Sequence, residues 1–101
     1  MASLEGMQRP PAEQSVLDRF FRDGRLVLMP TRRSKRLVVL DQVAQRFELG
    51  RTYPEHEVNA LLAPIHPDVA ALRRYLVDEQ FLTREGGIYW RSGGTVDLDG
   101  V

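Results

Sequence analysis

Apolar residues recur at helical spacing in three successive segments of the chain, at about residues 34–47, 54–62 and 68–79. Gly50 follows the first segment, and Pro64 and Pro67 follow the second. Because proline lacks a backbone N–H and disfavours a helical residue before it, the second and third segments cannot merge into one helix. The sequence therefore predicts three short helices joined by tight turns.

Each predicted helix has an apolar face that a core can bury. The residues on these faces are Leu37, Leu40, Ala44 and Phe47 in the first segment, Val58, Leu61 and Leu62 in the second, and Val69, Leu72 and Leu76 in the third. Ser34 is the expected N-cap of the first helix and Asp68 that of the third, because their side-chain oxygens can accept hydrogen bonds from free backbone amides.

Short β-prone runs follow the third helix at 81–84 and 88–91. Glu85-Gly86-Gly87 separates them, which is typical of a β-hairpin. Residues 51–53 can form a short extended link, so the order over 34–91 is helix, link, helix, helix, hairpin. This order predicts a winged helix-turn-helix. In such a unit the second helix enters the major groove of DNA, and here that helix is the one predicted over 68–79.

Two further elements precede the first of these helices. Helical spacing predicts a helix over 13–22, Asp23-Gly24 is expected to end it, and a short apolar run predicts a strand or extended segment at 26–29. We therefore expect an α+β fold that is winged helix-turn-helix-like, with an extra N-terminal helix and short strand and a C-terminal β-hairpin wing. The expected organisation is a flexible leader at 1–11, a single winged-helix-like domain at 12–91 and a flexible tail at 92–101.

The length of 101 residues allows one domain with one modest hydrophobic core. With 43% hydrophobic and 28% charged residues, the composition is that of a folded globular chain. No segment approaches the roughly 18 apolar residues that cross a bilayer, and the first residues lack the apolar run of a signal peptide. We therefore expect a cytoplasmic protein with no membrane partner.

Catalytic and metal-binding motifs are not recognisable in the sequence. The chain has no cysteine, which excludes disulfides, thiolate nucleophiles and the usual zinc-finger ligand sets. His56 and His66 match no standard metal-ligand spacing, and His66 could instead hydrogen-bond locally to fix the turn. We expect no catalytic residue, no metal and no cofactor, so an enzyme is unsupported.

The motif Thr31-Arg32-Arg33-Ser34-Lys35-Arg36 holds four positive charges in a chain of formal net charge zero. It stands at the N-terminus of the first predicted helix, where free amides and the helix dipole favour anions. No acidic residue follows Lys35 or Arg36 at the i+3 or i+4 spacing of an intrahelical salt bridge. Two interpretations stay open: the cluster contacts phosphates or another anion, or its side chains are solvated or pair with acidic residues of another element such as Glu55 and Glu57.

Further arginines lie on the third helix and on the hairpin. Arg73 and Arg74 are off the apolar face, so at least one is expected to project into solvent and reach guanine edges or phosphates. Arg74 stands four residues before Asp78 and could instead make only an intrahelical pair. Arg84 and Arg91 could let the hairpin touch a nucleic-acid backbone.

Aromatic and acidic residues also bear on nucleic-acid binding. Tyr89 and Trp90 either pack on the core or stack on bases or on a partner protein. Glu55 and Glu57 on the second helix would repel a phosphate backbone, unless they face away from it or the docking is unusual.

The leading hypothesis is a small regulatory domain that binds nucleic acid, with DNA favoured, and contacts phosphates through a basic helix N-terminus. The candidate contact residues are Arg32, Arg33, Ser34, Lys35, Arg36, Arg73, Arg74, Arg84 and Arg91. If the four basic residues of the 31–36 motif each neutralise one phosphate, log affinity should fall against log salt with a slope of about −3.6.

Two other functions remain open from the sequence. The alternative is a protein-interaction or dimerisation module, in which a homodimer or a partner protein would bury a surface made by Phe20, Phe21, Val27 and Trp90. A third hypothesis is an anion or metabolite sensor at the helix end that begins near Ser34.

The sequence also resembles a known family through several spaced motifs that occur in one order. These are Gly24-Arg25-Leu26, Pro30, Lys35-Arg36, Phe47, Tyr53-Pro54-Glu55-His56-Glu57-Val58-Asn59, His66-Pro67-Asp68, Leu72-Arg73-Arg74-Tyr75-Leu76-Val77-Asp78 and Tyr89-Trp90-Arg91. They are similar to the bacterial domain-of-unknown-function family 2087 over about residues 16–91. The resemblance implies a winged-helix-like domain that occurs alone or fused to helix-turn-helix transcriptional regulators, and it supplies no known activity.

Overall fold

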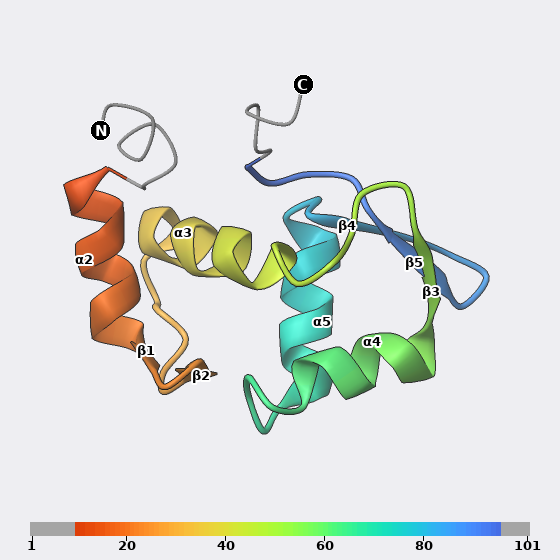
Figure 1. The fold of residues 1–101 in the computed structure, drawn as a ribbon, viewed down its shortest axis with the longest axis horizontal. Helices are drawn as coiled ribbons and strands as arrows, with labels where there is room; N and C mark the ends of the chain where they lie inside the picture. Colours follow the sequence, from red (N-terminus) through yellow and green to blue (C-terminus); the bar gives the residue numbers. More distant parts are fainter. Residues whose placement is uncertain (1–9, 96–101) are drawn as a thin grey trace, which may run out of the picture.

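The computed structural model describes residues 10–95. Its elements, in chain order, are α2 (Pro11–Phe20), β1 (Phe21–Arg22), β2 (Arg25–Leu26), α3 (Arg33–Ala44), β3 (Thr52–Pro54), α4 (Glu55–Leu62), α5 (Val69–Asp78), β4 (Leu82–Glu85) and β5 (Ile88–Arg91). Within these residues the fold is mixed α+β, with four helices and two small antiparallel sheets (Figure 1). None of the described helices is long and apolar enough to span a membrane. Most of the predicted leader at 1–11 and tail at 92–101 lies outside the described residues.

The N-terminal unit is a helix followed by a short hairpin. α2 ends two residues before the predicted end, because the chain turns into β1, which pairs with β2. Asp23 and Gly24 have φ angles of 52° and 80°, so both adopt the left-handed conformation that a two-residue hairpin turn requires. The apolar run at 26–29 joins this ladder only at its first residue, and Val27 and Leu28 beyond it are exposed.

The C-terminal sheet joins strands that lie far apart in the sequence. Its order is β3-β5-β4, so the strand that precedes α4 lies beside the last strand of the hairpin. Tyr53 on β3 and Arg84 on β4 are both Cα partners of Tyr89 on β5. The predicted hairpin is confirmed, and the extended link before α4 is the third strand of its sheet.

The hydrophobic core lies between α3, α4, α5 and the C-terminal sheet. Its fully buried side chains include Leu40, Phe47, Tyr53, Val58, Leu62, Leu72, Leu76, Leu82 and Tyr89. The rings of Phe47 and Tyr53 meet edge to face with centroids 5.1 Å apart. The Tyr53 hydroxyl also accepts a hydrogen bond from the Glu48 amide at 2.8 Å. Leu37, expected on the inward face of α3, is only partly buried.

The C-terminal end of α5 fixes the position of one acidic side chain. Gln80 has a φ angle of 65°, its amide donates to the Val77 carbonyl at 3.0 Å, and the Phe81 amide donates to the Leu76 carbonyl at 2.8 Å. These two bonds form a Schellman cap, with Gln80 at the left-handed position that glycine usually takes. Glu79 is thereby held at the end of α5, within ion-pair distance of the N-terminal turn of α3.

Candidate nucleic-acid interface

An open groove of about 740 Å³ runs between α5 and the β4–β5 hairpin, and we call it the α5 groove. Its lining residues are Asp68, Ala70, Ala71, Arg73, Arg74, Tyr75, Val77, Asp78, Arg84 and Tyr89. Arg74 from α5 and Arg84 from β4 are both exposed, and neither side chain makes a hydrogen bond or ion pair with a residue of the described part of the chain. The Arg84 guanidinium lies 5.8 Å from the centroid of the Tyr89 ring. The structure therefore places two available cations in one groove.

Asp68 and Asp78 bring negative charge to the same groove. The Asp68 side chain is the N-cap of α5, as predicted, and accepts a hydrogen bond from the Ala71 amide at 3.1 Å. The predicted intrahelical pair between Arg74 and Asp78 does not form in the structure. Arg74 therefore has no acidic partner among residues 10–95.

Arg73, the other arginine expected to reach nucleic acid from this helix, points to the junction with α4. Its NH1 donates to Asn59 Oδ1 at 2.5 Å, and its Nε lies 3.9 Å from Glu55 Oε1. Only 21% of the Arg73 side chain is exposed. Arg73 thus neutralises an acidic residue of the neighbouring helix, and Arg74 alone remains as the base-facing candidate on α5.

The two glutamates of α4 that the sequence placed near a phosphate backbone are both engaged elsewhere. The buried Tyr89 hydroxyl donates to Glu55 Oε1 at 2.7 Å, and this hydrogen bond, followed by the charge of Arg73, lowers the pKa of Glu55. Burial, and then the same hydrogen bond, raises the pKa of Tyr89. Glu57 pairs with Arg51 at 3.3 Å. Neither glutamate lines the α5 groove.

The basic residues Arg32, Arg33, Lys35 and Arg36, with Ser34 between them, form what we call the basic collar of α3. The helix begins at Arg33 with Arg32 as its N-cap and no side-chain cap, so the prediction of Ser34 as N-cap is wrong. The reason is that the extended Arg32 places its own carbonyl to accept the Lys35 and Arg36 amides, at 3.1 and 2.9 Å. Ser34 lies inside the first turn and is exposed.

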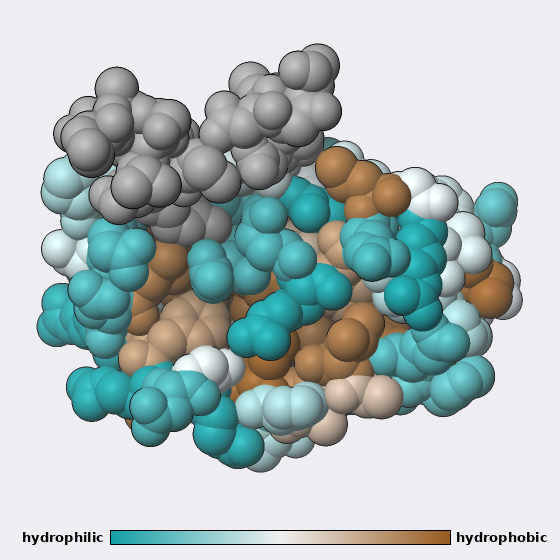
Figure 2. Space-filling view, in the orientation of Figure 1, coloured by the Kyte–Doolittle hydropathy of each residue, from teal (hydrophilic) through white to brown (hydrophobic). Residues whose placement is uncertain are grey.

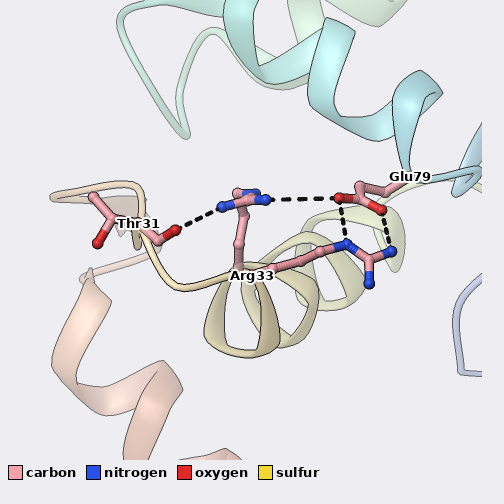
Figure 3. Close-up of polar contacts among 4 residues, drawn as sticks. Thr31, Arg33 and Glu79 are labelled. Atoms are coloured by element: carbon pink, nitrogen blue, oxygen red, sulfur yellow. Dashed lines mark hydrogen bonds and ion pairs between the residues drawn. The ribbon is translucent and has the colours of Figure 1, made fainter.

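Two arginines of the collar bind one carboxylate from α5 (Figure 3). Arg33 donates two hydrogen bonds to the Glu79 carboxylate, from Nε at 3.1 Å and from NH2 at 2.8 Å. Arg36 NH2 lies 3.8 Å from the same carboxylate, while Arg36 NH1 donates to the Thr31 carbonyl at 2.9 Å. The hydrogen bond from Arg33 is the main cause that lowers the pKa of Glu79. Two arginines of the collar therefore pair with an acidic residue of another element, which is Glu79 and not Glu55 or Glu57, the two examples named from the sequence.

One aromatic side chain, Tyr75, both contacts the collar and lines the α5 groove. The Arg36 guanidinium lies 5.4 Å from the centroid of the Tyr75 ring, and Tyr75 lines the α5 groove. The side chains of Arg32 and Lys35 make no hydrogen bond or ion pair with any residue that the structure describes. Arg32 is exposed and Lys35 is partly buried.

Arg91 is buried, with 9% of the residue exposed, and we remove it from the candidate interface. Its guanidinium donates to three backbone carbonyls, those of Phe47, Gly93 and Thr95. The side chains of a strand alternate between faces, and Arg91 falls on the core side together with Tyr89. Arg91 therefore joins the C-terminal segment to the end of α3 and is not available to a ligand.

The aromatic and apolar residues named for a protein contact do not form one surface. Phe20 and Phe21 belong to the N-terminal unit, whereas Trp90 is on β5 at the other end of the long axis (Figure 1). Hydrophobic side chains gather instead in the middle of the face drawn in Figure 2. Two hollows that share Arg46 have mixed linings, in which Leu17 and Leu61 stand beside charged side chains such as Asp18 and Glu57.

No metal site is visible in residues 10–95, since no group of three or more His, Cys, Asp or Glu side chains there could hold an ion. His66 Nδ1 lies 3.4 Å from the Leu26 carbonyl, so this histidine faces the β1–β2 hairpin rather than its own turn. His56 is exposed on α4.

Comparison with known proteins identifies the family of the chain. The model of the family described as uncharacterized protein conserved in bacteria (DUF2087) matches residues 25–91. The chain belongs to the DUF2087 family. Searches of curated proteins and of solved structures find no match. The matched region contains the collar, the α5 groove and Glu79, and it excludes α2 and β1.

Arg91→Gln should lower the free energy of unfolding by about 1–3 kcal/mol, because three carbonyls lose a charged donor and at least one of them is buried. Arg84→Gln is the matched control on the same hairpin and should change stability by less than about 0.5 kcal/mol. Chemical denaturation of both variants measures the difference. Equal stabilities would show that the Arg91 contacts contribute nothing.

Glu55→Gln should make thermal stability less sensitive to acid. Because the folded-state pKa of Glu55 is lowered from 4.5, its contribution is fully present above that value and is lost as pH falls through the lowered folded-state pKa. Melting temperatures between about pH 3 and pH 7 would measure this acid limb. Glu85→Gln removes an exposed carboxylate without a hydrogen-bond partner among the described residues, and it should keep the wild-type profile.

Proposed function

We propose that this domain is a winged-helix-like module that binds double-stranded DNA in a regulatory role. The order α3-β3-α4-α5-β4-β5 supports this proposal, as does the sheet in which β3 pairs with the hairpin. In the proposed complex, α5 enters the major groove and the β4–β5 hairpin is the wing that follows the backbone.

The single observation that carries the proposal is that Arg74 and Arg84 line the same groove and both lack an ion-pair partner among residues 10–95. Both guanidinium groups are exposed, and no residue of the described chain neutralises them with an ion pair. Arginine can bind guanine edges or phosphates through two parallel hydrogen bonds. A groove with one such residue on the helix and one on the hairpin fits a duplex that meets both elements together.

The charge distribution sets how strong such binding can be. The formal net charge is zero, and Asp78 lies on the rim of the α5 groove, so the chain does not attract DNA by total charge. The three cations that remain as phosphate contacts are Arg32, Lys35 and Arg84. Because Arg33 and Arg36 are engaged with Glu79, the collar contributes fewer contacts than its four charges suggest. Binding should therefore be modest and strongly dependent on salt.

Fluorescence anisotropy with labelled duplex DNA tests this proposal. Three phosphate contacts predict a slope of about −2.7 for log affinity against log salt, instead of the −3.6 expected from the collar alone. Arg84→Gln should reduce the slope to about −1.8. Arg74→Gln should cost about 1–3 kcal/mol on a duplex selected from a randomised pool and should relax its sequence preference.

Arg22→Gln is the matched control. It also removes one positive charge, but from β1, which lies away from the β4–β5 hairpin (Figure 1). This variant should bind with the wild-type slope. Absence of binding at about 50 mM salt, or a slope near zero, would refute the proposal. A loss in Arg22→Gln as large as that in Arg84→Gln would show that binding has no defined face.

A protein-interaction module is the second candidate, and the apolar face of Figure 2 favours it. The two hollows that share Arg46 have volumes of about 270 and 330 Å³, and their mixed linings offer places for apolar and charged side chains of a partner. If this face joins two copies of the chain, sedimentation equilibrium should show a dimer that persists in high salt. Ala60→Asp, at an exposed residue that lines one hollow, should then yield a folded monomer, whereas a wild-type monomer at all concentrations would exclude self-association.

A further inference from the structure

We propose that Glu79 is an intramolecular competitor of the DNA backbone, which keeps Arg33 out of the set of phosphate contacts. This inference rests on the proposed DNA-binding function. It assigns to the end of α5 a role in setting how tightly, and with what salt dependence, the basic collar of α3 binds.

Arg33 binds the Glu79 carboxylate through two hydrogen bonds, as arginine also binds the oxygens of a phosphate. Glu79 accepts hydrogen bonds from Arg33 Nε and NH2, at 3.1 and 2.8 Å, which form one of the two pairs of parallel donors that a guanidinium can offer to a phosphate. Three N–H groups of Arg33 stay free of this pair, but the carboxylate already neutralises the guanidinium charge. A phosphate that bound the free N–H groups would therefore gain little charge neutralisation unless Glu79 were released.

The two side chains of the pair differ in exposure. Arg33 is 67% exposed and would be accessible to DNA, whereas only 15% of the Glu79 side chain is exposed. A phosphate that displaced Glu79 would break two charge-assisted hydrogen bonds to its carboxylate, which is unfavourable. Isolated surface ion pairs contribute little, but a bidentate pair within a larger cluster is the exception.

Arg36 and the α5 cap make the cluster rigid. Arg36 is held by the Thr31 carbonyl and by packing against Tyr75, and its NH2 lies near the same carboxylate. Glu79 itself sits at the C-cap of α5, where its amide donates to Tyr75 and Val77 carbonyls. Removal of the Glu79 charge should therefore release Arg33, while Arg36 keeps its other two contacts.

The experiment compares the salt dependence of DNA binding in wild type and Glu79→Gln. The variant should bind more tightly at about 50 mM salt, and its slope should steepen from about −2.7 to about −3.6 because Arg33 adds one contact. Between about 50 and 200 mM salt, affinity should fall by about 40-fold in the wild type and by about 150-fold in the variant. The same slope in both proteins would overturn the inference.

Arg33→Gln provides a second, independent measurement with Glu79 in place. This variant should keep the wild-type slope, and Glu79→Gln/Arg33→Gln should return from about −3.6 to about −2.7. If Arg33→Gln alone lowers the slope, Arg33 already contacts DNA and the inference is wrong. This measurement decides the question even if Glu79→Gln does not fold, which circular dichroism would show.

Glu48→Gln is the control for net charge, because Glu48 pairs with Arg51 and does not line the α5 groove. If it steepens the slope as much as Glu79→Gln does, the effect is one of total charge and the inference fails. If binding depends on Arg84 but is unchanged in Glu79→Gln, the inference about Glu79 is refuted and the proposed function is not. No binding by the wild type or any variant refutes the proposed function as well.

Discussion

The pairing of β3 with β5 determines how the rest of this domain is arranged. It places Tyr53 beside Tyr89, so the residues that begin α4 lie directly over the last strand of the hairpin. Glu55 then meets the Tyr89 hydroxyl, and Arg73 on α5 meets Glu55 and Asn59. One ladder thus fixes α4 to the sheet, and α4 in turn fixes α5. The α5 groove exists because these two helices and the hairpin are held in this relation.

The same arrangement divides the arginines into two groups with different roles. Arg73 and Arg91 bind partners within the fold. Arg73 binds polar side chains of α4, and Arg91 binds backbone carbonyls. Arg74 differs from Arg73 by one position along α5. Arg84 lies on the same sheet face as Arg91 but nearer the turn of the hairpin, opposite Tyr89, and both Arg74 and Arg84 are exposed. A small change of position along an element therefore separates a structural arginine from one that can meet a ligand.

Local patterns in the sequence predict much of this fold. Helical spacing located the four described helices, Asp68 was recognised as a cap, and the glycines after Glu85 indicated the hairpin. The error at Ser34 is also local, because N-cap propensity does not tell which of several neighbouring residues will be extended. The backbone of Arg32 decided it.

Contacts between distant residues could not be predicted from such patterns. Glu79 is 46 residues from Arg33, and no helical or strand spacing relates the two. The burial of Arg91 depends likewise on the carbonyl of Phe47, which is 44 residues away. The register of β3 against β5 had no signal in the sequence beyond a short extended link. The candidate site is made of these distant contacts, so its residue types were foreseen better than its connections.

The Schellman cap at Gln80 makes the electrostatics of the collar depend on the length of α5. Each residue of an α-helix advances by about 100° around the axis, so one residue more or fewer before the cap would point Glu79 away from α3. Substitutions within α5 would leave that angle unchanged. Among DUF2087 proteins, an insertion or deletion at this helix end would therefore alter the charge of a surface on another helix, although no charged residue had been gained or lost.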